Sequence, residues 1–512
     1  MEEKKSKGVI LVVILLMLII GICVWLTLNK DKEESPSTYD VESSNEYQSY
    51  RIEGNSLQEF DLYFLGLENK EENKIYSPLS IKYALGMLSE GAKDETKEQI
   101  DNIIGTYEVK KYSNNSNMSF ANALFIRDSF KDLVEENYVN TLVNKYGAEV
   151  IYDSFNDAST LNNWVSNKTF NLVNNLFDDV SDNDFILTNA LAIDMEWVNK
   201  IQSEYEDYYA KNEHINYYCR VSGLSNSYYY NLEFEGLDNP VMSVAIGASI
   251  NKYDIVSELG EDNIRKTVGD AYTEWLINSD CDTTNEPDVK TYLDSYIEEL
   301  DSNYKDIGSS TDFSFYSDDN VKVFSKDLKE YNGMTLQYIG IMPKNDSLNT
   351  YISNLNVSEV NNIISNLKGI EYDNFEDGVI TKITGYIPMF SFDYELDLMN
   401  DLNTLGINNI FNPSLSNISG ITSVNGSYIN KAIHKANIDF SNDGIKASAA
   451  TIMGGKGGGG CYFEYYYDVP VNEIDLTFDR PYLFLIIDKT SKEVWFTGTV
   501  YEPTEYSYEL IK

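Results

Sequence analysis

Few residues in this chain are of a type and spacing that could carry out catalysis. His214 and His434 are its only histidines, and neither lies in an H-E-x-x-H motif, so the sequence excludes a histidine-rich zinc site. The sequence also lacks the G-x-S-x-G nucleophile elbow and the P-loop. We therefore predict no enzymatic activity, no metal site and no cofactor.

A glycine tract near the C-terminus formally satisfies a nucleotide-binding pattern. Gly455, Gly457 and Gly460 fit G-x-G-x-x-G, and Asp475 follows where a ribose-binding acid would be sought. However, a run of glycines fits any glycine pattern, and no helix is expected to begin after this one. We treat the match as accidental.

The cysteines are too few and too scattered to form a disulfide framework. The four are Cys23, Cys219, Cys281 and Cys461. A Cys219–Cys281 bridge is one interpretation for an oxidising compartment, and unpaired thiols are the favoured one.

The charge of the chain limits its partners. It has 39 Lys and Arg against 82 Asp and Glu, a net charge of −43, which repels phosphate backbones. We therefore exclude nucleic acid as a partner.

An apolar segment near the N-terminus is long enough to cross a membrane. Residues 9–28 read "VILVVILLMLIIGICVWLTL", and twenty helical residues span about 30 Å, the thickness of a bilayer core. A cleaved signal peptide is the alternative, but its apolar region would be shorter and a small-x-small cleavage site would follow. The lysines before the segment favour a cytoplasmic location for residues 1–8 and export of the chain that follows the segment. We expect a single-pass anchor in the cell membrane, a flexible linker over 29–56, and one domain over 57–512 facing the extracellular side.

The domain mixes helical and strand patterns, which indicates an α+β fold. Residues 80–92 place Ile81, Ala84, Leu85 and Leu88 on one helical face. Continuous apolar runs predict buried strands at 184–193, 335–343 and 481–488.

Five segments resemble motifs of the serpin family, in the family's order. They are "NKIYSPLSIKYALGMLSEGAKDETKEQI" (73–100), "LTNALAIDMEW" (187–197), "IPMFSFDYELDLMNDLNTLGINNIF" (387–411), "INKAIHKANIDFSNDGIKASAA" (429–450) and "FDRPYLFLIIDKTSKEVWFTGTVYEP" (478–503). The resemblance, to a bacterial-type membrane-anchored member, implies a serpin fold with three β-sheets, surrounding helices and an exposed reactive loop, after one transmembrane helix.

The resemblance also implies a hinge at the start of the reactive loop. In serpins a protease cuts this loop, and its first half enters the central sheet as a new strand, which requires small, uncharged inward side chains. The implied hinge residues are Gly444, Ile445, Lys446, Ala447, Ser448, Ala449, Ala450 and Thr451. Ile445 and Lys446 depart from the Thr or Ser and the Glu usual in inhibitory serpins. We expect bulk at Ile445 to slow insertion.

The loop is about a dozen residues longer than is usual in the family, so several bonds are candidates for cleavage. Counting from the hinge places the scissile bond at Gly458–Gly459. Lys456–Gly457 suits a trypsin-like protease, and Tyr462 or Phe463 suits a chymotrypsin-like one.

Five further residues match family positions around the opening of the central sheet. Ser77, Ser80, Asn189 and His434 match the shutter, which lies beneath the parting strands, and Trp197 matches the breach at the top of the opening. The family assigns them a structural role, as does their type alone.

Residues 245–320 align with no family segment. An amphipathic pattern within 289–300 predicts at least one helix, so we expect a packed helical insertion, with a partner-binding insertion as the alternative.

The sequence thus predicts a monomeric, surface-displayed serpin that traps a serine protease or, as a second option, a cysteine protease. The alternative is a non-inhibitory serpin acting as a surface binding module, which Ile445, Lys446 and the overlong loop favour.

Overall fold

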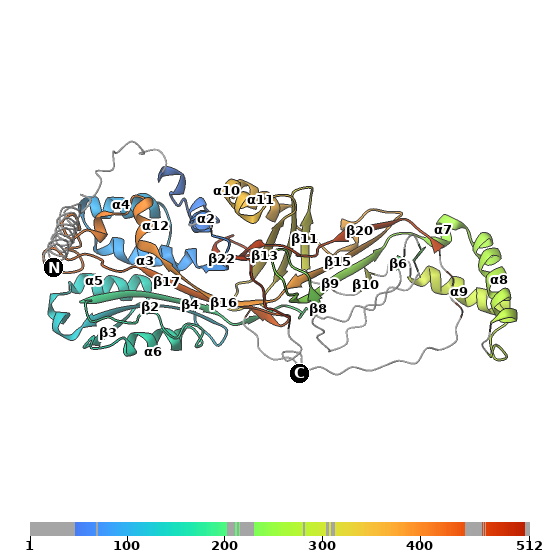
Figure 1. The fold of residues 1–512 in the computed structure, drawn as a ribbon, viewed down its shortest axis with the longest axis horizontal. Coiled ribbons are helices and arrows are strands. Elements are labelled where there is room, and N and C mark those ends of the chain that lie inside the picture. Colours follow the sequence, from blue (N-terminus) through green and yellow to red (C-terminus); the bar gives the residue numbers. More distant parts are fainter. Residues whose placement is uncertain are drawn as a thin grey trace, which may run out of the picture. The chain divides into compact units, whose positions relative to one another are not determined.

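The computed structural model describes most of the unit Tyr47–Lys512 (Figure 1). The described residues are 47–67, 70–201, 210–211, 214–215, 230–279, 282–303, 307–308, 313–445, 463, 465 and 467–506. Within them, no helix combines the length and the apolar character that crossing a membrane requires. The predicted anchor at 9–28 lies outside them, as do all four cysteines.

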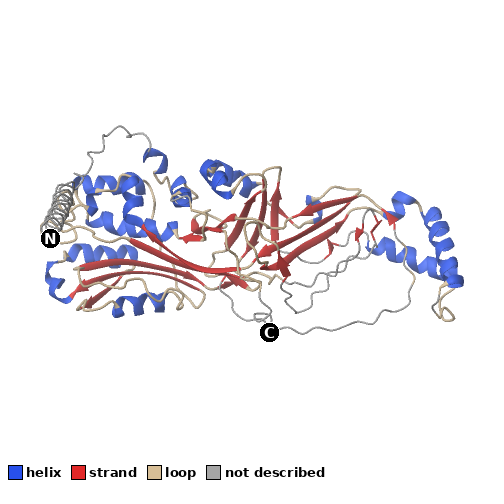
Figure 2. Cartoon of the chain, in the orientation of Figure 1, coloured by secondary structure: helices blue, strands red, loops and turns tan. Residues whose placement is uncertain are grey.

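The described chain contains runs of successive strands and runs of successive helices, in agreement with the α+β prediction (Figure 2). The α-helices are α2 (Glu59–Gly66), α3 (Pro78–Gly91), α4 (Asp94–Ile104), α5 (Glu136–Thr141), α6 (Ser159–Lys168), α7 (Ile255–Leu259), α8 (Glu261–Asn278), α9 (Val289–Asn303), α10 (Leu348–Asn354), α11 (Val357–Ser365) and α12 (Leu398–Thr404). The short helices are η1 (Tyr47–Tyr50), η2 (Asp128–Leu133), η3 (Leu142–Tyr146), η4 (Tyr372–Asn374) and η5 (Asn409–Phe411).

A seven-stranded sheet carries much of the core. Its strands, in spatial order, are β1 (Lys74–Tyr76), β22 (Val494–Val500), β21 (Tyr482–Asp488), β13 (Leu336–Pro343), β12 (Val321–Asp327), β11 (Phe313–Ser317) and β14 (Lys368–Gly369). Strands β13 and β21, which were predicted from continuous apolar runs, are buried except for the last residue of β21. Strand β22 is buried along its whole length.

The first two described strands that follow the predicted loop, β19 (Tyr467–Asp468) and β20 (Val471–Asp475), belong to a small three-stranded sheet and to a five-stranded sheet. The five-stranded sheet joins β10 (Ile307–Gly308), β9 (Val241–Asn251), β15 (Ile380–Pro388) and β20, with β8 (Tyr230–Leu232) on β9. The three-stranded sheet joins β19, β7 (His214–Ile215) and β6 (Ala210–Lys211).

Two further sheets flank an opening. One has the order β3 (Glu149–Asp153), β2 (Met118–Arg127), β4 (Phe185–Ile193). The other has the order β16 (Phe390–Asp397), β17 (Ile433–Phe440), β18 (Gly444–Ile445), β5 (Met195–Glu196). The described strands therefore pair as five sheets where three were expected. One extra sheet arises because β4 and β17 are not paired, and only β18 and β5 continue the second group toward the first at one end. The other extra sheet is the small one of β19, β7 and β6, which is not paired with the five-stranded sheet in the described residues.

Two segments outside the predicted family motifs contain regular secondary structure. Residues 47–56, placed by the sequence at the end of a linker, contain η1 and the fully buried Ile52. Between β9 and β11, within the segment that aligned with no serpin motif, lie α7, α8 and α9. Figure 1 shows these three helices together beyond the ends of β9, β15 and β20.

Candidate functional site

The candidate site is the opening between β4 and β17. Strand β4 is the outer strand of its sheet, and β17 is continued toward it only by the two-residue β18. Residues of both strands line one cleft of about 370 Å³, with α3 beneath it. An unpaired strand edge is a template for another strand, so the cleft is suited to accept one.

The end of this opening is closed by the start of the predicted hinge. Gly444 pairs antiparallel with Glu196, and Ile445 pairs with Met195 on one side and Phe440 on the other. The Ile445 side chain is 2% exposed and lines a small hollow with Ile193, Ile438 and Phe496. We expected its bulk to oppose entry into the sheet, but Ile445 already lies inside it in the uncut chain.

Gly444 permits the close approach of β18 to β5. A Cβ atom at this position would lie 2.2 Å from the carbonyl oxygen of Met195 and 2.7 Å from Cα of Glu196. Because these are backbone atoms, they cannot move aside independently. The pairing of β18 with β5 therefore requires glycine here.

Trp197 secures the same end of the opening. Its fully buried indole donates from Nε1 to the carbonyl oxygen of Ser441 at 2.9 Å, and its backbone N–H donates to the carbonyl of Asp443 at 3.0 Å. The ring makes edge contacts with Tyr338 and Phe440. This places Trp197 against the hairpin that carries the hinge.

Ion pairs flank Trp197 on both sides. Lys200 Nζ lies 2.5 Å from Asp443 Oδ1, and Lys329 pairs with Glu196. The hydrogen bond and charge of Lys329 lower the pKa of Glu196, so this carboxylate stays ionised. The first pair joins the segment after β5 to the turn before β18, and the second joins β5 to the segment after β12.

The structure brings Ser77, Ser80, Asn189 and His434 to the walls of the one cleft. Ser77 caps α3, since its Oγ accepts the backbone N–H of Ser80 at 3.1 Å. The backbone N–H of Ser77 in turn donates to His434 Nε2 at 2.9 Å. A β17 side chain is thereby attached to the beginning of α3.

Accepting that hydrogen bond requires neutral imidazole at Nε2. Burial lowers the pKa of His434 to about 4, which keeps the ring neutral at physiological pH. On the opposite wall, Asn189 donates from Nδ2 to Asn122 Oδ1 at 2.8 Å, and Asn122 donates to the carbonyl of Tyr146 at 2.9 Å. These polar groups position structure and show no arrangement for catalysis.

The segment after α6 covers the cleft from the other side. Leu176 and Phe177 line it, Asn183 Nδ2 donates to Asn430 Oδ1 at 3.0 Å, and Lys435 Nζ donates to the carbonyl of Asn175 at 3.3 Å. These contacts bridge the two sides of the opening. A strand that entered the cleft would lie next to this cover.

The rest of the predicted loop lies outside the described residues. This applies to Lys446, Ala447, Ser448, Ala449, Ala450 and Thr451, and to the candidate bonds Lys456–Gly457 and Gly458–Gly459. Sequence reasoning missed Ser441, Asp443, Asn183 and Asn430, because polar residues in turns carry no signal until their partners, far along the chain, are known.

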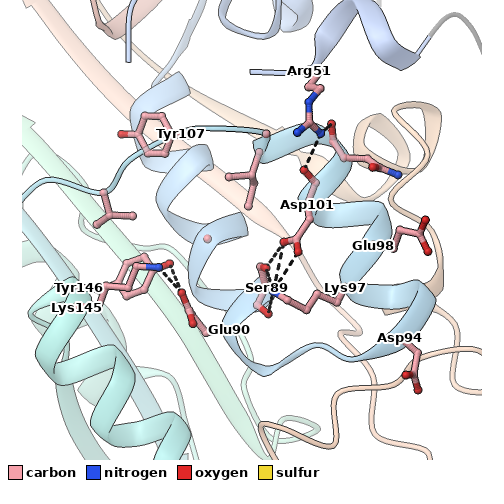
Figure 3. Close-up of a pocket in the computed structure, with 15 residues that line it drawn as sticks. Arg51, Ser89, Glu90, Asp94, Lys97, Glu98, Asp101, Tyr107, Lys145 and Tyr146 are labelled. Atoms are coloured by element: carbon pink, nitrogen blue, oxygen red, sulfur yellow. Dashed lines mark hydrogen bonds and ion pairs between the residues drawn. The ribbon is translucent and has the colours of Figure 1, made fainter. Parts of the chain in front are cut away.

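A second cleft, of about 570 Å³, is lined by residues of α3 and α4 (Figure 3). Its cationic groups are held by neighbours: Lys97 Nζ lies 3.2 Å from Asp101 Oδ2, Lys145 Nζ lies 2.5 Å from Glu90 Oε1, and Arg51 donates to the carbonyl of Asp101 at 3.2 Å. These cationic groups are therefore engaged by groups of the chain itself.

Comparison with known proteins agrees with this geometry. The family model described as "Serpin (serine protease inhibitor)" matches residues 59–216 and 308–503. Serpin B4 of Homo sapiens is 22% identical, over 88% of this chain and 99% of its own length. An uncharacterized serpin-like protein of Methanosarcina acetivorans is 24% identical, over 92% and 88%.

Among solved structures, the thermophilic serpin tengpin in its native state superposes with a TM-score of 0.57, at 19% identity, over 88% of this chain and 96% of that one. The bacterial type and the membrane anchor stay predictions. The family model alone covers more than half of the sequence, and on that basis the chain belongs to the serpin family.

Proposed function

We propose that this protein is an inhibitory serpin, displayed on the cell surface, that traps a serine protease, or alternatively a cysteine protease, as a covalent complex. The observation that carries the proposal is the pairing of Gly444–Ile445 between β17 and β5 at one end of an otherwise open cleft. The first two residues of a new strand are already in register. Further residues would extend β18 between the facing edges of β4 and β17, which have no other strand partner there within the described residues.

The protease supplies the catalytic groups. This chain supplies the peptide bond that is cleaved and the loop segment that becomes a strand. The protease nucleophile attacks the carbonyl carbon of Gly458, the bond to the nitrogen of Gly459 breaks, and that amine leaves with a proton from the protease. An acyl-enzyme remains. If residues after Ile445 enter the cleft faster than water hydrolyses the ester, the attached protease is carried along and its active site is distorted.

Incubation of the chain with a panel of serine and cysteine proteases tests this function. We expect a protein–protease adduct that survives denaturing electrophoresis, together with a free C-terminal fragment. Sequencing the first residues of that fragment identifies the cleaved bond, with Gly459 expected and Gly457 the second expectation. Complete cleavage by every protease without any adduct would contradict inhibition.

Surface display is the second part of the proposal, and it rests on the apolar run at 9–28 and the lysines before it. Protease added to intact cells is expected to cut the loop and leave a C-terminal fragment of roughly fifty residues. Cleavage seen only after lysis would reverse the assigned orientation.

A non-inhibitory surface binding module is the alternative function. It is favoured by Lys446 at a position where inhibitory serpins carry Glu, and by the length of the loop between Gly444 and Pro481. Such a protein would be cut as an ordinary substrate, so the absence of adducts in the protease panel separates the two functions.

A further inference from the structure

The C-terminal side of the reactive loop is held by the helical insertion. Helices α8 and α9 pack against each other, and Tyr272 of α8 stacks on Tyr292 of α9 with ring centroids 3.9 Å apart. Tyr272 is fully buried and donates from its hydroxyl to the carbonyl of Pro287 at 3.1 Å. The two helices thus form a platform of rings.

Phe463 of the loop lies against this platform. Its ring centroid is 5.1 Å from that of Tyr272, 5.7 Å from that of Tyr292 and 5.9 Å from that of Trp275. Two of these are edge-to-face contacts, a favourable geometry for aromatic pairs.

The residues after Phe463 continue the attachment. Tyr467 is 4% exposed, donates from its hydroxyl to that of Tyr296 on α9 at 2.9 Å, and pairs through its backbone with Ile215 of β7. Val469 is 7% exposed in the same apolar cluster as Leu293 and Ile297 of α9. We name the described residues 463, 465 and 467–469 the C-terminal arm.

We propose that α8 and α9 are a clamp for the C-terminal arm, and that this clamp directs proteolysis to bonds on the N-terminal side of Phe463. A protease must take the side chain before the scissile bond into its specificity pocket and hold the flanking backbone extended. Phe463, Tyr465 and Tyr467 satisfy the preference of chymotrypsin-like proteases by type, but the first and last are engaged by the helices. The inference rests on the proposed function and deepens it, because it assigns the insertion a role in selecting the bond.

Cleavage of the full-length chain by a chymotrypsin-like protease, with N-terminal sequencing of the fragments, tests the clamp. We expect cleavage after Phe463, Tyr465 and Tyr467 to be slow in the unaltered chain and about tenfold faster in Tyr292→Ala, because loss of aromatic contacts raises the population of the detached arm. Tyr296→Phe, which removes only the hydroxyl partner of Tyr467, is expected to give a smaller increase. Ile277→Ala is the control, since Ile277 lies on α8, the other helix of the clamp, and is 73% exposed.

Two further measurements make the result decisive. Cleavage after Lys326 of β12, which is 4% exposed, by a trypsin-like protease is expected to stay slow in all variants, which excludes general unfolding as the cause. Equal rates of cleavage after Phe463 in the unaltered chain and in both clamp variants would overturn the clamp. Because these rates require no covalent adduct, the clamp can hold while inhibition fails, and inhibition can hold while the clamp fails.

Discussion

His434 is a neutral hydrogen-bond acceptor on the wall of the cleft, and this makes stability depend on pH. Its pKa is about 4 in the folded chain against an ordinary value of 6.5. Between these values the unfolded chain binds a proton that the folded chain does not, so stability falls as pH decreases through this window. The shift corresponds to a loss of about 2 kcal/mol at pH 5.

The variant His434→Gln isolates that contribution, because glutamine accepts a hydrogen bond and does not titrate. We expect urea unfolding to show a smaller loss of stability between pH 7 and pH 5 in His434→Gln than in the unaltered chain. His434→Ala, which leaves the Ser77 N–H without its acceptor, is expected to cost about 1–3 kcal/mol at pH 7. Parallel pH profiles for His434→Gln and the unaltered chain would contradict a neutral imidazole in the folded chain.

At Gly444, the addition of a single methyl group is expected to prevent the pairing of β18 with β5. We expect Gly444→Ala to separate these strands and to increase amide hydrogen exchange at Trp197 and Ile445, measured by mass spectrometry. Gly66→Ala is the control, since a Cβ atom there meets nothing within 4 Å. Unchanged exchange in Gly444→Ala would mean that the closed end of the cleft does not depend on this approach.

At the scale of elements, the side chains of an inserted strand would point alternately to the two faces of the sheet. Because Ile445 faces inward in β18, every second residue after it, including Ala449, would face inward in a longer strand, whereas Ala450 would face solvent. Ala449→Arg would then bury an unpaired charge, which costs several kcal/mol. Slower insertion gives the protease time to complete hydrolysis.

We therefore expect Ala449→Arg to raise the ratio of cleaved chain to covalent adduct, and the matched variant Ala450→Arg to leave it close to the parental value. Densitometry of the two products measures this ratio after reaction with an active protease that the unaltered chain inhibits. If both arginine variants gave the parental ratio, the loop would not act by entering the sheet.

Elements with strong local patterns could be predicted from the sequence, and contacts between distant segments could not. The apolar runs at 184–193, 335–343 and 481–488 correspond to β4, β13 and β21, and the helical face at 80–92 corresponds to α3. Burial was predicted correctly for β13 and β21, whereas β4 alternates between buried and partly exposed residues because the strand lines the cleft. The burial of Ile445 before cleavage was not predictable, because it depends on backbone pairing with Met195 across the opening. The clamp was missed for a similar reason: Phe463 was weighed as a cleavage site, and its ring partners lie in an insertion that no family motif describes.

At the scale of the whole molecule, insertion of the loop would change the number of strand edges and the volume of the cleft. In the uncut chain, β4 and β17 border a space of about 370 Å³. A new strand there would pair with both edges and bury apolar side chains, and both changes favour the folded state. Cleavage of one peptide bond would therefore stabilise the molecule although it divides the chain.

Thermal unfolding before and after cleavage at Lys456 by a trypsin-like protease measures this effect. We expect the midpoint to rise on cleavage in the unaltered chain and in Ala450→Arg, and to rise much less in Ala449→Arg, because the buried charge opposes insertion. The fragments stay associated through β20, β21 and β22, so the comparison is between two folded states. An unchanged midpoint in the unaltered chain would show that the cleft does not accept the loop. In that case the paired hinge would be a static structural feature, and the protein would be the surface binding module rather than the inhibitor.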